Sequence, residues 1–150
     1  MKVDMGFERI SEAIRELEVP KVDLVIGIGR GGVVPASLLA YRLGCGLIVM
    51  PINYRDDENQ PQHDVPRIDG HPAIPAGVRS ILLVDDVSVS GSTLQAARRI
   101  LADYHVTTLV LKGKADIVVF PHISSCVNWP WNSELSLTSR RFDILESTGG

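Results

Sequence analysis

Residues 81–94 read Ile81-Leu-Leu-Val-Asp-Asp-Val-Ser-Val-Ser-Gly-Ser-Thr-Leu94, and this pattern predicts the fold class. The four apolar residues 81–84 do not alternate with polar ones, which indicates a strand buried on both faces, as in a parallel sheet. Two carboxylates stand at its carboxyl end, followed by small hydroxyl residues around Gly91 and by helical spacing over 93–104. Ligands of open α/β sheets bind beyond the carboxyl ends of such strands.

The loop after the acidic pair suits a phosphorylated sugar. Backbone N–H groups at a helix N-terminus bind phosphate, and small residues let the backbone approach it closely. Ionised carboxylates accept hydrogen bonds from ribose hydroxyls and help to hold Mg²⁺. The combination favours a phosphorylated ribose as the ligand. No lysine follows Gly91, so this is not a Walker A loop.

The residues from Val84 to Thr93 resemble the signature of the type I phosphoribosyltransferases, which bind 5-phosphoribosyl 1-pyrophosphate (PRPP). The resemblance implies that Asp85 and Asp86 are catalytic, binding ribose hydroxyls and Mg²⁺, while the residues after them hold the 5′-phosphate. The PRPP-binding residues it implies in this segment are Asp85, Asp86, Val87, Ser88, Val89, Ser90, Gly91, Ser92 and Thr93. The alternative interpretation is an acidic pair that caps a helix in an unrelated α/β domain.

A second glycine-rich segment, Gly27-Ile-Gly-Arg-Gly-Gly32, lies between a predicted strand over 22–28 and helical spacing over 33–43. It fits the G-x-G-x-x-G fingerprint of dinucleotide-binding proteins. That fingerprint also needs an acid at the end of the second strand, about 20 residues on. Here no acid appears before Asp56, which weakens the dinucleotide interpretation.

The alternative for this segment is a pyrophosphate loop. Arginine offers a fixed, forked charge that suits phosphate oxygens, and glycines permit unusual dihedrals and exposed N–H groups. The segment from Ile28 to Pro35 resembles the corresponding loop of the xanthine, guanine and hypoxanthine phosphoribosyltransferases. In that family the loop binds the pyrophosphate leaving group, which implies Arg30, Gly31 and Gly32 as PRPP ligands and a catalytic role for Arg30.

The same resemblance extends to a base site. In the 6-oxopurine enzymes a Lys-Pro-Asp precedes a strand and an aromatic-aliphatic pair that contact the purine. Laid residue by residue onto this chain, Lys114, Cys126 and Val127 take the base-binding positions, and Asp116 matches the family Asp. Two other residues carry alternatives: Trp129 as the stacking ring, and Trp131 as either a core residue or part of a family Pro-Trp pair.

Two departures from the family pattern concern the base. Val89 stands where the 6-oxopurine enzymes usually have an Asp that exchanges a proton with the purine, and valine can neither accept nor donate one. Cys126 removes a stacking ring. Because neither change touches the phosphoribosyl site, PRPP chemistry is better supported than purine specificity.

The resemblance therefore implies Mg²⁺-dependent transfer of the phosphoribosyl group from PRPP to a nucleobase, with a purine favoured and pyrophosphate released. It also implies a homodimer or homotetramer. Two alternatives remain. One is a non-catalytic PRPP- or nucleotide-binding regulatory module, and the other is transfer to a base that is not a 6-oxopurine.

Composition agrees with one globular domain over 1–150, because hydrophobic content is 45% and charged content 22%. The net charge of −3 argues against nucleic-acid binding through bulk electrostatics. Two cysteines without metal-ligand spacing, and no long apolar run, favour a cytoplasmic protein that meets no membrane. The expected fold is α/β, a mainly parallel twisted sheet flanked by helices, with an irregular hood loop over 53–77.

Overall fold

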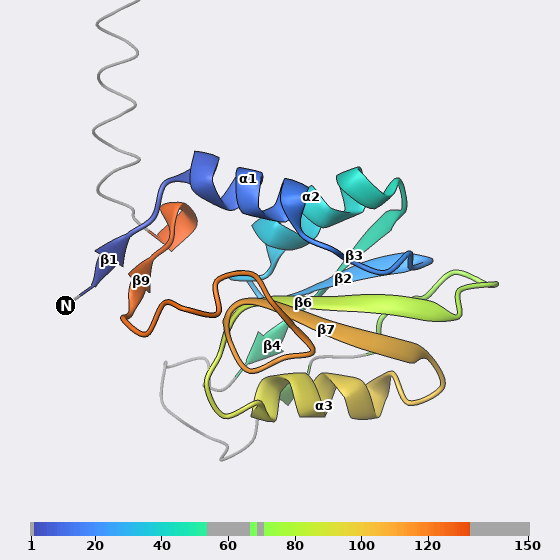
Figure 1. Cartoon of the computed structure of the whole chain (residues 1–150). Helices are drawn as coiled ribbons and strands as arrows, with labels where there is room; N and C mark the ends of the chain where they lie inside the picture. The colour runs from blue at the N-terminus through green and yellow to red at the C-terminus, as the bar shows by residue number, and fades with distance from the viewer. Residues whose placement is uncertain (1, 54–66, 69–70, 133–150) are drawn as a thin grey trace, which may run out of the picture.

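The computed structural model describes residues 2–53, 67–68 and 71–132 (Figure 1). The helices are α1 (Phe7–Glu16), α2 (Val33–Leu43), α3 (Ser92–Ile100) and the 3₁₀ turn η1 (Pro130–Asn132). The strands are β1 (Val3–Asp4), β2 (Leu24–Ile28), β3 (Gly46–Met50), β4 (Ile52–Asn53), β5 (Arg67–Ile68), β6 (Ser80–Ser88), β7 (His105–Gly113), β8 (Ile117–Val118) and β9 (Val127–Asn128). Within these ranges no helix has the length and apolar content needed to cross a membrane.

Five of the described strands form a parallel sheet in the order β3-β2-β6-β7-β8. Helices α1 and α2 cover one face and α3 covers the other, so the expected α/β fold is confirmed (Figure 1). The chain moves outward from β2 to β3, then returns past β2 to β6 and continues in the opposite direction. Because such crossovers are right-handed, this reversal puts α2 and α3 on opposite faces. The switch point between β2 and β6 is where ligands bind in sheets of this kind.

The central strand β6 is buried as predicted but is longer than expected. Residues 81–84 have 0% exposure, as a strand covered on both faces requires. We expected the acidic pair to follow the strand, but it lies within it: Asp85 is in register with Val110, and Ser88 with Gly113. Pairing with β7 therefore carries the extended conformation up to the start of the hydroxyl-rich loop.

Two apolar clusters fill the space on either side of the sheet. The cluster under α1 and α2 includes Trp129, which is 2% exposed and stacks between Phe120, at 6.4 Å between ring centroids, and Trp131, at 5.8 Å. The alternative in which Trp129 stacks on a base is wrong, because the neighbouring rings cover it. Trp131 packs against the same cluster and belongs to the core.

The boundaries of several elements differ from those predicted. The apolar run over 47–52, which predicts one strand, forms two: β3 ends before Pro51, since proline has no N–H to donate, and β4 begins after it. The helix expected over 93–104 ends at Ile100, because Leu101 leaves helical geometry and the chain must turn before β7. The hood expected over 53–77 lies mainly outside the described residues. At its base, β4 and β5 pair in antiparallel fashion.

Asp116 fixes the loop between β7 and β8. Its carboxylate accepts hydrogen bonds from the buried Thr108 N–H, at 2.9 Å, and from the Arg98 guanidinium, while its own N–H donates to Thr108 Oγ1. Burial raises the pKa of Asp116, but the hydrogen bonds from Thr108 and the charge of Arg98 outweigh burial and hold the pKa below its ordinary value. The carboxylate matched to the family Asp thus has a structural role in this chain.

We expect Asp116→Asn to lower the thermal unfolding midpoint near neutral pH by about 3 °C, on the order of 1 kcal/mol. A carboxylate with a depressed folded pKa adds stability above its unfolded pKa of about 3.9, and this contribution is lost as the pH falls further. The difference from the starting protein should therefore shrink between neutral pH and about pH 3. Thermal scans at both pH values check this, with the exposed Asp103→Asn as control. An equal deficit at both pH values would contradict it.

Candidate functional site

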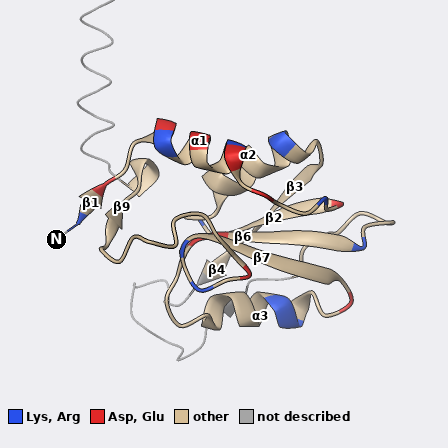
Figure 2. Cartoon of the chain, viewed as in Figure 1, with Lys and Arg blue, Asp and Glu red and all other residues tan. Residues whose placement is uncertain are grey.

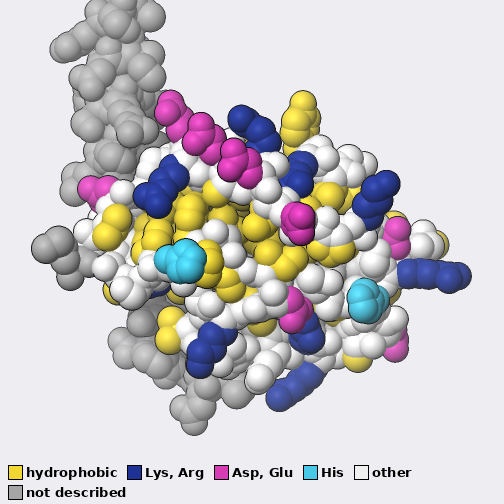
Figure 3. Space-filling view, in the orientation of Figure 1, with side chains coloured by type: hydrophobic (Ala, Val, Ile, Leu, Met, Phe, Trp, Pro, Cys, Tyr) yellow, Lys and Arg dark blue, Asp and Glu magenta, His cyan; other side chains and the backbone are white. Residues whose placement is uncertain are grey.

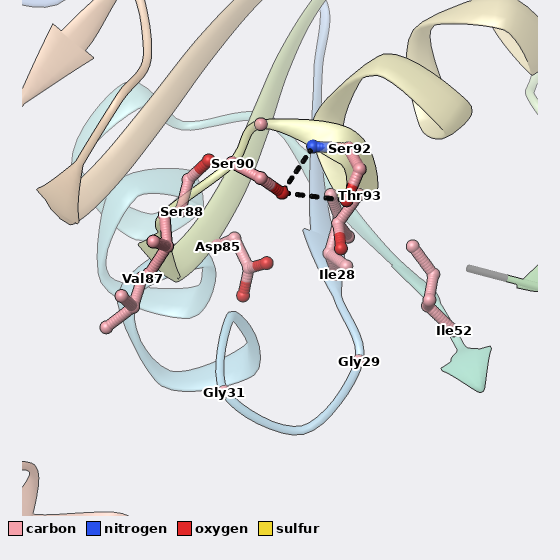
Figure 4. Close-up of a pocket in the computed structure, with 12 residues that line it drawn as sticks. Ile28, Gly29, Gly31, Ile52, Asp85, Val87, Ser88, Ser90, Ser92 and Thr93 are labelled. Carbon is pink, nitrogen blue, oxygen red and sulfur yellow. Dashed lines mark hydrogen bonds between the residues drawn. The ribbon is translucent and has the colours of Figure 1, made fainter. Parts of the chain in front are cut away.

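A cavity of about 350 Å³ opens at the switch point, beyond the carboxyl ends of β2 and β6 (Figure 4). Its walls come from the loop after β2, the start of β4, the end of β6 and the first turn of α3. The lining residues are Ile28, Gly29, Gly31, Ile52, Asp85, Val87, Ser88, Val89, Ser90, Gly91, Ser92 and Thr93. The structure therefore brings the two sequence segments that we singled out to the walls of one cavity.

Asp85 points into the middle of this cavity (Figure 4). It is only 9% exposed and accepts a hydrogen bond from the Asp86 N–H at 2.8 Å. Burial, followed by repulsion from the Asp86 carboxylate, raises the pKa of Asp85 to about 8. A ligand that donates hydrogen bonds or brings positive charge would favour the ionised form and lower that pKa. Asp85 is thus suited to bind a group rich in hydroxyl donors.

Asp86 and Arg30 are not among the residues that line the cavity, but Asp86 contacts Gly31 on its opposite wall. Its carboxylate accepts the Val87 N–H at 2.7 Å and lies directly against the backbone of Gly31, where any Cβ would collide with it. Glycine at this position therefore permits the acidic pair of β6 and the loop after β2 to touch. The two predicted halves of the site are in contact through these residues.

The loop after β2 offers groups that can bind an anion. Gly29 has φ +53°, a conformation that glycine adopts easily, and its N–H donates to the Met50 carbonyl at 2.8 Å. Among the described residues, the N–H groups of Arg30 and Gly31 have no hydrogen-bond partner, and the exposed Arg30 guanidinium makes no ion pair. Gly32 does not line the cavity, because it is buried where α2 meets the sheet.

The N-terminus of α3 provides the other anion-binding wall. Gly91 has φ +84°, and as the N-cap residue it offers no side chain to cap the helix. The Ser90 hydroxyl accepts the Ser92 N–H at 3.3 Å and lies 3.0 Å from the Ser92 hydroxyl (Figure 4). Ser88 Oγ is buried and has no partner among the described groups. A buried hydroxyl without a partner is costly, so a polar ligand in the cavity would relieve it.

The predicted base-binding residues lie outside the cavity wall. Lys114 is exposed on the loop after β7, where its N–H donates to the Ser88 carbonyl at 2.8 Å and so holds this loop to the cavity rim. Cys126 and Val127 lie at the small β1–β9 sheet, where Val127 is paired with Val3. Their assignment to a base therefore stays a prediction.

Three lining residues were not among the predicted site residues: Ile28, Gly29 and Ile52. Ile28 and Gly29 come where β2 ends, and Ile52 begins β4 just after β3. Their positions at the ends of predicted strands could have indicated them, because the carboxyl ends of parallel strands meet at one edge of a sheet. That inference, however, requires the order of the strands in the sheet. Val89, at the rim, is 80% exposed, so the cavity presents an apolar side chain where the family resemblance predicts an acid.

The carboxylates at the cavity fit a magnesium ion that is coordinated partly by the protein and partly by oxygens of a substrate. Mg²⁺ is usually bound by one or two carboxylates together with waters and phosphate oxygens, and Asp85 and Asp86 offer such a pair. Within the described part of the chain, no group of three His, Cys, Asp or Glu side chains could hold a metal alone. A metal in this cavity would therefore require oxygens from the ligand.

Comparison with known proteins agrees with this geometry. The family model described as "Phosphoribosyl transferase domain" matches residues 3–123. The chain belongs to the phosphoribosyltransferase domain family. This phosphoribosyltransferase domain includes both loops that line the cavity and the whole five-stranded sheet.

Its relatives include enzymes and a regulator. A protein named transcriptional regulator GfcR from Methanocella arvoryzae is 31% identical over 64% of this chain and 46% of that protein. A xanthine-guanine phosphoribosyltransferase from Gluconobacter oxydans is 35% identical over 51% of this chain and 46% of that protein. The phosphoribosyltransferase domain thus matches about half the length of each of these two relatives.

A solved structure agrees over most of the chain. The purine phosphoribosyltransferase from Pyrococcus horikoshii superposes with a TM-score of 0.69 at 25% identity, and the match covers 88% of this chain and 95% of that one. The fold similarity therefore extends well beyond the segments that carry the motifs.

Proposed function

We propose that this protein transfers the 5-phosphoribosyl group from PRPP to a nucleobase, with a purine as the favoured acceptor, and releases pyrophosphate. The observation that carries the proposal is the meeting of three features in one cavity. These are the buried Asp85, the glycine loop with two N–H groups that have no partner among the described residues, and the N-terminus of α3. A molecule with a ribose diol, a pyrophosphate and a 5′-phosphate matches these three features in that order.

Each wall has a role in this proposal. The N-terminus of α3, with Ser88, Ser90 and Ser92, binds the 5′-phosphate through N–H and hydroxyl donors. Asp85 and Asp86 accept hydrogen bonds from the ribose hydroxyls, which orients C1 toward the acceptor. On the far side, Arg30 and the N–H groups of its loop bind the pyrophosphate and stabilise the charge that grows on it as the C1–O bond breaks.

Binding of Mg²⁺ at the acidic pair would supply further neutralisation of the pyrophosphate charge. The chain's own part is to hold the two reactants in line and to keep water away from C1. A ring nitrogen of the base forms the new bond to C1, and the proton that this nitrogen carried must leave. Val89 cannot take the proton, so another residue or water must accept it.

A second candidate function is a PRPP- or nucleotide-binding regulatory module without transfer. The match to GfcR, which is named a transcriptional regulator, favours this alternative. The departures at Val89 and Cys126 agree with it as well, because they alter the base site and leave the phosphoribosyl site intact. Transfer remains the preferred proposal, because a module that only binds has no need of a leaving-group loop with Arg30.

The test is pyrophosphate release from PRPP and Mg²⁺ with guanine, hypoxanthine, xanthine, adenine, uracil and orotate supplied separately. We expect release with at least one purine. The same panel with Val89→Asp shows whether the missing acid limits turnover with 6-oxopurines, in which case their rates rise. No release with any base, together with tight PRPP or nucleotide binding by calorimetry, would support the regulatory module and contradict the transferase.

A further inference from the structure

The turn between β7 and β8 is fixed at one end to β6 and at the other to α3. We call residues 113–116 the β7–β8 turn, and residues 88–93, from the end of β6 to the first turn of α3, the phosphate wall. The residues of the β7–β8 turn do not line the cavity. This turn can therefore affect a ligand only through the residues that it holds in place.

The first attachment is a close backbone contact between Gly113 and Ser88. The two residues are in register, and the Lys114 N–H donates to the Ser88 carbonyl at 2.8 Å. Gly113 has φ +115°, a conformation that other residues rarely adopt. A Cβ on Gly113 would collide with the Ser88 carbonyl oxygen and lie 2.7 Å from the carbonyl carbon. Glycine is therefore needed here for β7 to approach the start of the phosphate wall.

The second attachment joins the β7–β8 turn to α3. The basic residues of this helix, Arg98 and Arg99, lie in its last turn (Figure 2). The Arg98 guanidinium donates to the Asp116 carboxylate and, at 3.4 Å, to the Val106 carbonyl of β7. Asp116 is itself held by its hydrogen bonds with Thr108. The phosphate wall thus lies between two points that one short turn ties to β7.

Phosphate binding at this wall depends on accurate placement of its donors. Ser88 Oγ is buried and has no partner among the described groups, so its position decides whether it reaches a ligand. Acidic and basic side chains are mixed over the face that Figure 3 shows, and the net charge of the chain is −3. Anion binding therefore relies on a few local donors. Misplacing such groups by about 1 Å can remove much of their effect.

We propose that Gly113 is a positioning residue for the 5′-phosphate and that the β7–β8 turn holds the phosphate wall in place. This inference rests on the proposed function, because it concerns the same ligand. Gly113 allows the Lys114 N–H to reach the Ser88 carbonyl, and this contact fixes where Ser88 Oγ meets the phosphate. Lys114 contributes here through its backbone N–H. Among the described residues, the loop after β2 has no backbone hydrogen bond to this turn, so pyrophosphate binding is independent of it.

Gly113→Ala tests this proposal when the two parts of the ligand are titrated separately by calorimetry. We expect the dissociation constant for ribose 5-phosphate to rise about 10-fold or more, because the new Cβ displaces Ser88. The constant for pyrophosphate with Mg²⁺ should change by less than about 2-fold. The control is Gly77→Ala, since Gly77 has φ +90° but open space around it and precedes β6, at the end of the sheet away from the cavity. It should leave both constants unchanged.

Amide exchange in the unaltered protein gives a test that does not depend on the folding of a variant. If the β7–β8 turn positions the phosphate wall, ribose 5-phosphate must in return stabilise the turn, because coupling between two sites is reciprocal. Ribose 5-phosphate should therefore slow the exchange of the Lys114 N–H by about 5-fold more than pyrophosphate does.

The expected and the contradicting results are distinct in both experiments. A folded Gly113→Ala protein that keeps its affinity for ribose 5-phosphate within about 2-fold would overturn the proposal, as would equal losses for the two ligands. Equal slowing of the Lys114 exchange by both ligands would overturn it too, and this measurement decides if Gly113→Ala does not fold. These results leave the proposed function standing. A starting protein that binds neither ligand would contradict the proposed function and this inference together.

Discussion

Gly32→Ala is expected to lower the free energy of unfolding by about 3 kcal/mol. Gly32 has φ −84°, which alanine adopts without strain, so the cost comes entirely from the space around it. A Cβ would collide with the Val84 carbonyl and lie 2.7 Å from the Ile28 carbonyl oxygen. These atoms belong to the two central strands, which cannot shift without breaking the sheet. We expect the loop after β2 to lose its ligand-binding geometry as well.

Substitutions at two other glycines distinguish the steric cost of an added Cβ from the cost of an unfavourable backbone conformation. Gly29→Ala meets no atom within 4 Å but has φ +53°, so we expect a loss of about 1 kcal/mol from conformation alone. Gly6→Ala has open space and φ −76°, and it should change the stability very little. Urea denaturation of the three variants gives the values. A Gly32→Ala protein as stable as Gly6→Ala would show that α2 and the sheet are less tightly packed than described.

Asp85→Asn is expected to raise stability while lowering kcat/KM by about 10³-fold. Turnover falls because an amide replaces the buried carboxylate that would receive the ribose hydroxyls. Stability rises because the asparagine keeps the shape and can still accept the Asp86 N–H, but carries no buried charge beside Asp86. A variant that is better folded and nearly inactive would mark Asp85 as a residue kept for function.

The pH dependence of this gain follows from the raised pKa of Asp85. Between the unfolded pKa, about 4, and the raised folded pKa, the folded protein binds the extra proton, so its stability falls as the pH rises. Asparagine does not titrate, so the gain should be absent near about pH 4, grow as the pH rises, and reach several °C near about pH 8. Thermal scans check this, with Asp103→Asn as control. A midpoint at pH 8 below that of the starting protein would refute it.

The central strand and its motif were predictable because their signals are local. The run over 81–84 needed no partner to be recognised, and all four residues are fully buried. The extension of β6 to Ser88 could not be predicted, since acidic residues disfavour strands and the extension depends on pairing with β7, about 25 residues later in the chain. Here the pairing with β7, which the sequence does not reveal, outweighs the low strand propensity of the acidic residues.

The part of the candidate site that the two motif loops build was also predictable, whereas the predicted base-binding residues do not line the same cavity. Asp85, Ser88 and Gly31 belong to short motifs, and the structure places all three around one cavity. For the predicted base site, the sequence position of Trp129 made it an alternative stacking ring. In the structure, however, Phe120 and Trp131 bury this ring. Whether an aromatic residue is core or ligand depends on contacts between distant segments, which spacing cannot show.

The pairing of β1 with β9 has a consequence for the order in which the chain folds. Among the described residues, the cluster under α3 draws on positions 24–118, so this part of it can close once β8 has been synthesised. The cluster under α1 and α2 contains Met5 and Ile10 but is completed by Trp129, made more than a hundred residues later. Since domains fold as they leave the ribosome, α1 waits for its cover until Trp129 has been made. During synthesis, the apolar face of α1 with Ile10 therefore stays exposed for longer than the cluster under α3.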